Sequence, residues 1–272
     1  MGIIENYYLS NKEMLSNMVS LINPKNTDVV LDVGTGEGNT AMALAEGCKV
    51  KKVFAIDMDT ERLKKFEEKL EVRKKEGIQF SDIEIKECSY EEMESAFKDI
   101  KFDIITCRAA LHHFRSPETF LNLAYKLLKD DGKLNIMDPF FTEKTKFLWS
   151  SMAKIRESDL QNFYTLEEYL KMLENAKFQV VACLIFRFPR EFNEWIKSLP
   201  TLDKNIPLRF KEVIKNMAEN VKEELLIQED EKGNLIWFYN CFELLAVKQP
   251  PPNQYLKIEK IKFKIENKIN VK

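Results

Sequence analysis

Three glycines and two aspartates lie close together in the first quarter of the chain. The segment VLDVGTGEG holds Gly34, Gly36 and Gly38 directly after an apolar run that contains Asp32. Glycines at such a turn let the backbone approach a ligand closely. Asp57 ends the next apolar run, KVFAID, where a carboxylate can accept hydrogen bonds from both hydroxyls of a ribose. The pattern predicts a site for a ligand that contains a nucleoside.

The spacing of the glycines favours one class of ligand. A dinucleotide fingerprint reads G-x-G-x-x-G, and its last glycine lies inside the helix that seats a pyrophosphate. Here the pattern is D-x-G-x-G-x-G, and the carboxylate of Asp32 would repel a pyrophosphate. S-adenosylmethionine (SAM) fits better, because it carries an ammonium and a sulfonium and no phosphate. A site for NAD and a plain strand–helix turn with tolerated glycines stay open as alternatives.

The two histidines of the chain, His112 and His113, are adjacent and follow the apolar run FDIITC. Neighbouring side chains diverge and rarely chelate one ion, and no Cys, Asp or Glu falls at metal-ligand spacing nearby, so we expect no metal. An imidazole titrates near neutral pH, so either histidine could act as a catalytic base, and His113 is favoured. In the alternative interpretation neither is catalytic, and both shape a pocket.

Short apolar runs alternate with helical stretches from residue 29 to about 138. The expected strands of this region are 29–34, 52–57, 83–88, 102–107 and 133–138. This alternation predicts an α/β fold with a Rossmann-like, doubly wound parallel sheet. Two later strands, 178–188 and 235–248, would complete a seven-stranded sheet with an antiparallel strand at one edge.

Composition excludes several classes of protein. The chain has 272 residues and a net charge of −2, which argues against binding that depends mainly on nucleic-acid phosphates. Its five cysteines form no C-x-x-C pair, a usage typical of free thiols in a reducing compartment. No apolar run approaches the roughly 20 residues that span a bilayer, and the first residues lack the basic and apolar regions of a secretory signal, so we expect none. We expect a cytoplasmic protein without a transmembrane segment.

The segments VLDVGTGEG, FAIDMD, FDIITCRAALHHF and YKLLKDDGKLNIMD occur here in the order typical of the class I SAM-dependent methyltransferases. The chain resembles that family from about residue 5 to 248. Within the class it looks most like the small-molecule branch around the UbiE-type ubiquinone/menaquinone methyltransferases. The resemblance implies an enzyme that uses SAM and releases S-adenosylhomocysteine (SAH).

The same resemblance implies a domain organisation. Residues 1–248 would form the methyltransferase domain, with helical insertions at about 139–164 and 189–231 as a lid over the substrate. The Lys-rich segment 249–272 follows consecutive prolines, and we expect a basic, loosely ordered C-terminal tail there.

The family's cofactor residues can be carried over by position. They are Tyr8, Asp32, Gly34, Thr35, Gly36, Asp57, Met58, Ser89, Tyr90, Cys107 and Arg108. Asp57 would hold the ribose and Met58 would pack on the adenine. The family usually has Asp-Ala where this chain has Ser89 and Tyr90. Ser89 also forms a capping box with Glu92, and capping alone would explain this serine.

The resemblance also places residues near the acceptor of the methyl group. These are His113, Asp138, Arg156 and Tyr164. The UbiE-type pattern has Arg-Asn at the two histidine positions, so the base and the acceptor can differ here. Aromatic residues outside the strands would suit either a lid over an apolar acceptor or an insertion that buries its own face.

The predicted function is transfer of a methyl group from SAM to a small, apolar or aromatic acceptor, a quinone precursor or another secondary metabolite. A small molecule is the expected partner, and no nucleic acid is expected. The alternatives are an RNA or protein methyltransferase, a SAM-binding protein without catalysis and a NAD-dependent oxidoreductase. The acceptor atom and the oligomeric state are not predicted.

Overall fold

The computed structural model describes residues 10–47, 49–156, 159–197, 205–231 and 233–248. Its strands are β1 (Val29–Val33), β2 (Lys52–Asp57), β3 (Asp82–Glu87), β4 (Phe102–Arg108), β5 (Leu128–Phe140), β6 (Phe178–Glu191), β7 (Gln228–Glu229) and β8 (Leu235–Lys248). Its α-helices are α1 (Asn11–Ile22), α2 (Asn39–Ala45), α3 (Thr60–Lys75), α4 (Met93–Ala96), α5 (Pro117–Leu127), α6 (Lys146–Arg156), α7 (Leu166–Asn175), α8 (Phe192–Ile196), α9 (Asn205–Lys215) and α10 (Glu219–Leu225). Two short 3₁₀ helices cover Tyr90–Glu92 and Leu111–His113.

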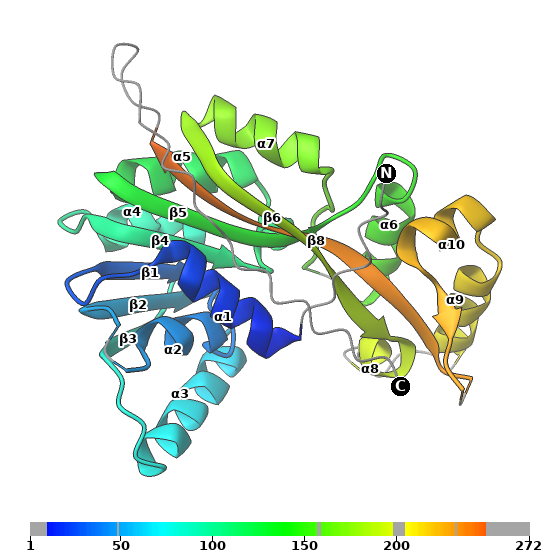
Figure 1. Cartoon of the computed structure of the whole chain (residues 1–272), viewed down its shortest axis with the longest axis horizontal. Helices are drawn as coiled ribbons and strands as arrows, with labels where there is room; N and C mark the ends of the chain where they lie inside the picture. Colours follow the sequence, from blue (N-terminus) through cyan, green and yellow to red (C-terminus); the bar gives the residue numbers. More distant parts are fainter. Residues whose placement is uncertain (1–9, 48, 157–158, 198–204, 232, 249–272) are drawn as a thin grey trace.

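One sheet organises the fold (Figure 1). Its strand order is β3-β2-β1-β4-β5-β8-β6, and β7 pairs with β8. Strands β1 to β5 pair in parallel, whereas β8 is antiparallel to both β5 and β6. The order reverses between β1 and β4, and ligands of such sheets bind at the carboxyl ends of the strands near that point.

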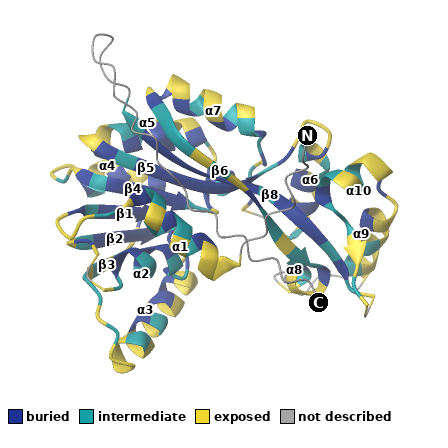
Figure 2. Ribbon diagram, in the orientation of Figure 1, coloured by how far each residue is buried: buried dark blue, intermediate teal, exposed yellow. Residues whose placement is uncertain are grey.

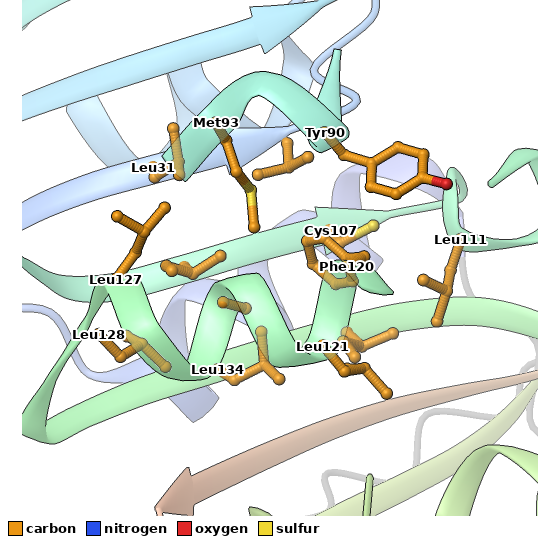
Figure 3. Close-up of a cluster of buried hydrophobic side chains, with 14 of the residues drawn as sticks. Leu31, Tyr90, Met93, Cys107, Leu111, Phe120, Leu121, Leu127, Leu128 and Leu134 are labelled. Atoms are coloured by element: carbon orange, nitrogen blue, oxygen red, sulfur yellow. The ribbon is translucent and has the colours of Figure 1, made fainter. Parts of the chain in front are cut away.

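Helices cover both faces of the sheet, as the parallel pairing requires. On one face α1, α2 and α3 pack against the strands through residues such as Met18, Leu44 and Phe66. On the other face α4, α5 and α7 form a second core, part of which Figure 3 shows between α5 and the strands. The central strands are therefore buried on both faces (Figure 2).

The insertions form a third hydrophobic cluster beside the sheet. Strands β6 and β8 extend beyond the parallel strands, and α6, α8, α9 and α10 gather around their far ends (Figure 1). Trp149, Trp195 and Trp237 pack together there, with ring centroids 5.4–6.1 Å apart. Phe141 and Phe163 belong to the same cluster. The sequence left two roles open for these aromatics, a lid over an acceptor and burial of the insertion's own face. Their packing in one buried cluster corresponds to the second role.

The structure confirms the predicted fold class and refines its details. The antiparallel strand β8 lies one position in from the edge, between β5 and β6. Strand β5 begins at Leu128, because Leu128 pairs with Phe102 before an irregularity in the ladder. The sequence suggested no strand at β7, which is only two residues long. Among the described residues no helix is both long and apolar enough to cross a membrane. The predicted basic tail, 249–272, lies outside the described residues.

Candidate active site

The glycine loop after β1 adopts a backbone that side chains would obstruct. Gly34, Gly36 and Gly38 have φ of +68°, +54° and +76°, in the left-handed region that favours glycine. A Cβ on Gly34 would lie 2.5 Å from the Cβ of Ala110, and one on Gly38 would lie 2.0 Å from the ring of Phe66. Residue type thus fixes a tight turn between β1 and α2.

Asp32, one of the predicted cofactor residues, is buried beneath this loop. Its carboxylate accepts hydrogen bonds from the hydroxyls of Thr35 (2.6 Å) and Thr106 (2.7 Å). Burial raises the pKa of Asp32 to about 6, although both hydrogen bonds and the charge of Arg108 act in the opposite direction. The group is therefore poised to ionise more fully when a cation binds nearby.

Asp57 connects the end of β2 to the glycine loop. Its carboxylate accepts hydrogen bonds from the backbone N–H of Gly36 at 2.7 Å and of Asp59 at 2.9 Å. The same side chain that could accept from a ribose therefore also holds the loop in place. A substitution here would disturb both roles.

A cavity of about 330 Å³ opens beside the loop. Six of the predicted site residues line it, namely Gly34, Asp57, Met58, Ser89, Tyr90 and His113. Met58 is 75% exposed on its rim, as an apolar side chain that packs on a ligand's flat face would be. Asp32, Thr35 and Gly36 lie in or below the turn, and Cys107 and Arg108 lie at the end of β4; none of the five lines the cavity. Tyr8 lies outside the described residues.

The segment after β3 contributes a wall to the cavity. The hydroxyl of Ser89 donates to the carboxylate of Glu92 (2.9 Å), so this serine does form the capping box. The ring of Tyr90 stacks on that of Phe114 with centroids 4.2 Å apart, and its hydroxyl accepts from the N–H of Ser116. The aromatic pair is a flat surface suited to a planar ligand group.

His112 and His113 have different surroundings. His112 is buried, and its Nδ1 lies 2.7 Å from Oδ1 of Asp138. The other oxygen of Asp138 accepts from the N–H of His112 (3.0 Å) and from the hydroxyl of Tyr169 (2.9 Å). This network ties the turn after β4 to β5 and α7, so His112 and Asp138 hold the wall behind the cavity. Neither residue lines it.

His113 lies on the cavity wall. Its side chain is 20% exposed, and its Nδ1 lies 3.1 Å from Oδ2 of Asp159, which also lines the cavity. The hydrogen bond and charge of His113 lower the pKa of Asp159 to about 2, so this carboxylate is ionised at neutral pH. Sequence reasoning missed Asp159, because it lies in an irregular segment where no periodicity or spacing distinguishes it.

The remaining predicted residues lie away from the cavity. Arg108 donates to Thr40 at 3.2 Å and to Asn11 at 3.0 Å, and so ties α1 and α2 to the end of β4. Arg156 lies over the ring of Trp195, in the cluster formed by the insertions. Tyr164 packs beside Tyr169, with centroids 5.4 Å apart. Cys107 is buried in the sheet, and burial raises the pKa of its thiol well above the usual range.

Fold and site together define a class of protein. A Rossmann-like sheet with this strand order, a glycine turn after β1 and an acid at the end of β2 is a nucleoside-binding architecture. A family model described as a methyltransferase domain matches residues 24–198. The chain belongs to this family and is a class I SAM-dependent methyltransferase.

Individual relatives agree with this assignment. The uncharacterized methyltransferase YcgJ of Bacillus subtilis is 25% identical over 62% of this chain, and a ubiquinone biosynthesis O-methyltransferase of Haemophilus ducreyi is 33% identical over 39%. These matches span only 64% and 42% of the relatives' own lengths. A protein of Bacillus halodurans C-125 described as a methyltransferase has a solved structure with a TM-score of 0.77, at 26% identity over 87% of this chain and 99% of its own.

The residues of the cavity fit the family's methyl donor. Gly34 presents backbone without a side chain to the cavity, and Asp57 offers a carboxylate on the same cavity wall, next to the turn. Asp32 supplies negative charge below the loop, whereas a dinucleotide's pyrophosphate would need the opposite sign. Among the described residues no group of three or more His, Cys, Asp or Glu could hold a metal ion.

Proposed function

We propose that this chain transfers the methyl group of SAM to a small acceptor, and that His113 removes a proton from the acceptor. SAM, when bound, supplies a methyl carbon already activated by a sulfonium. The protein's own residues then have to bind, align and desolvate the two partners, which accounts for much of the acceleration in such displacements. A base is needed when the attacking atom carries a proton.

The observation that carries the proposal is the pair formed by His113 and Asp159 on the wall of the cavity. Because the carboxylate of Asp159 lies 3.1 Å from Nδ1, its negative charge favours the proton on that nitrogen. We assign Nε2 to the acceptor's proton. The anionic carboxylate would also stabilise the imidazolium that forms when the proton is taken.

The size and charge of the site support a small acceptor. A cavity of about 330 Å³ is at the small end of ligand pockets, and much of it would be taken by the nucleoside. The aromatic pair Tyr90 and Phe114 and the exposed Met58 give the cavity an apolar part, beside charged groups such as Asp57 and Asp159. A small acceptor that combines an apolar or aromatic body with ionisable hydroxyl or amine groups suits such walls. The insertions at about 139–164 and 189–231 would act as the lid, the first of them through Asp159 and Gln161, which line the cavity. A cytoplasmic location stays our prediction.

The experiment is a methyl-transfer assay with radiolabelled SAM. Purified protein is incubated with a panel of small phenols, quinols and amines, and with RNA and protein from a lysate as competing acceptor classes. Label should pass to a small molecule and not to macromolecules. Label found only on RNA or protein would contradict the proposal.

A further inference from the structure

Polar side chains occupy the sheet face beneath α1, beyond the cavity already described. Arg108 of β4 stands opposite Met137 of β5, which stands opposite Glu243 of β8. Residues opposite one another on adjacent strands share a face. Arg108 donates to Asn11, so this face is the one that α1 covers. The three side chains lie at the carboxyl end of β4, the end at which such sheets bind ligands.

Glu243 is almost completely buried there, at 1% exposure. Its Oε1 accepts a bond of 3.3 Å from Nδ2 of Asn135, a fully buried residue of β5. The same amide nitrogen donates to the carbonyl of Leu244 at 3.0 Å. Within the described part of the chain, Oδ1 of Asn135 has no hydrogen-bond partner.

Such an arrangement is costly unless a ligand completes it. An unsatisfied buried acceptor costs about 1–3 kcal/mol, and a buried carboxyl costs more. Burial raises the pKa of Glu243 to about 7, although the hydrogen bond from Asn135 and the charge of Arg108 act in the opposite direction. An apolar residue at this buried position would stabilise the fold more than a glutamate does. The neighbouring Leu244 and Leu245 of β8 are examples of such residues.

The polar pair lies next to the cofactor machinery. Asn135 stands opposite Thr106 of β4, which stands opposite Asp32 of β1. The hydroxyl of Thr106 donates to Asp32. Neighbouring strands are about 4.8 Å apart, so roughly 10 Å separates the backbone at Asn135 from that at Asp32. A small molecule held at Asn135 could reach a methyl group held above Asp32.

From these contacts we infer that Glu243 and Asn135 form a binding site for the head group of the methyl acceptor, and that this head group is a hydrogen-bond donor, an amine or a hydroxyl. Both protein groups present acceptor oxygens. The inference rests on the proposed function, because it supplies the acceptor for that reaction.

The surroundings match an acceptor with an apolar body. Met14 of α1 and Met137 of β5 are buried in one cluster with Tyr239 and Cys241 of β8. Methionine side chains adapt readily to ligands of varied shape. The first turn of α1, whose residues Asn11, Lys12 and Glu13 are exposed, lies on this side of the sheet, because Asn11 accepts from Arg108.

The test compares three small monosubstituted benzenes on the full chain saturated with SAH. Benzylamine and phenol carry donors, whereas benzoate carries acceptors alone at neutral pH. Calorimetry should show that at least one donor probe binds ten times or more tightly than benzoate. Glu243→Gln keeps the shape but removes the charge, and should weaken benzylamine at least tenfold and phenol less. Exposed Glu174→Gln is the matched control.

A second variant, Asn135→Ser, removes the amide and should weaken both donor probes. The inference is overturned if benzoate binds as well as the donors, if no donor probe binds, or if both variants leave the preference unchanged. The rise in thermal stability caused by SAH alone is measured in the same samples. It shows whether the cofactor binds, and so distinguishes failure of this inference from failure of the proposed function. A chain that binds SAH but ignores the donor probes retains its methyltransferase assignment and lacks this site.

Discussion

Nδ1 of His113 lies 3.1 Å from Oδ2 of Asp159, and both side chains line the cavity that contains Gly34 and Asp57. His113 belongs to the turn after β4, and Asp159 belongs to the segment after α6. The contact therefore joins two segments that are distant in the sequence. It distinguishes His113 from its neighbour His112, whose ring faces the buried Asp138. The two histidines therefore predict different phenotypes.

His113→Gln should lower kcat by 10²–10⁴-fold and change the dissociation constant of SAM by less than about threefold, because general-base catalysis contributes about that much to the rate. Asp159→Asn should lower kcat less and shift the pH profile of kcat, since it weakens the orientation of the ring. Single-turnover rates and calorimetry measure the two quantities. An unchanged kcat in His113→Gln would exclude the base.

The buried network around Asp138 should dominate stability. Asp138→Ala leaves the Nδ1 and N–H of His112 and the hydroxyl of Tyr169 without their acceptor, which should cost about 3 kcal/mol or more. Tyr169→Phe removes one hydrogen bond to a charged group and should cost about 1.5–3 kcal/mol. Urea unfolding measures both values, and exposed Asp131→Asn serves as control. Equal stability of Asp138→Ala and the control would contradict this account.

Gly34→Ala and Gly77→Ala separate backbone strain from crowding. Both glycines have positive φ, +68° and +83°, so each substitution should cost about 1–2 kcal/mol through the backbone alone. The new Cβ meets nothing within 4 Å at Gly77 but lies 2.5 Å from Ala110 at Gly34. Unfolding should show a further loss of about 1–3 kcal/mol at Gly34, together with lost binding of SAM. Similar losses of unfolding free energy in the two variants would show that contact with Ala110 does not destabilise Gly34→Ala.

The pKa of Asp32 predicts a pH dependence of stability. Its folded value of about 6 exceeds the unfolded value of about 3.9, so the folded state binds the proton more tightly. This contribution is fully present below about pH 4 and is lost as pH rises through 6. Wild type should therefore lose about 2 kcal/mol more than Asp32→Asn between pH 4 and 7. Parallel curves for the two proteins would show that the carboxyl has an ordinary pKa.

The sequence predicted the sheet well because its strands carry local signals. Apolar runs such as KVFAID end at glycines or aspartates, and β2 and β8 have the predicted bounds. The glycine loop was also predictable, since its residue types are required by the turn itself. Six predicted site residues do line one cavity.

Other features depend on tertiary contacts that leave no local pattern. Asp159 and Tyr169 reach their histidine and aspartate partners only once α6 and α7 have packed. Arg156 has the residue type of a substrate-binding group, but its guanidinium lies over Trp195. Glu243 lies in an apolar strand, where only burial distinguishes its carboxyl.

The most direct test of the central claim is thermal unfolding with SAM, SAH and NADH. At about 100 times its dissociation constant, a ligand stabilises the folded state by roughly 2.7 kcal/mol, which should raise the Tm of this chain by about 5 °C or more. SAM and SAH should both produce this rise, and NADH should leave the Tm unchanged. A rise with NADH, or none with SAM and SAH, would contradict the assignment of this cavity to the methyl donor.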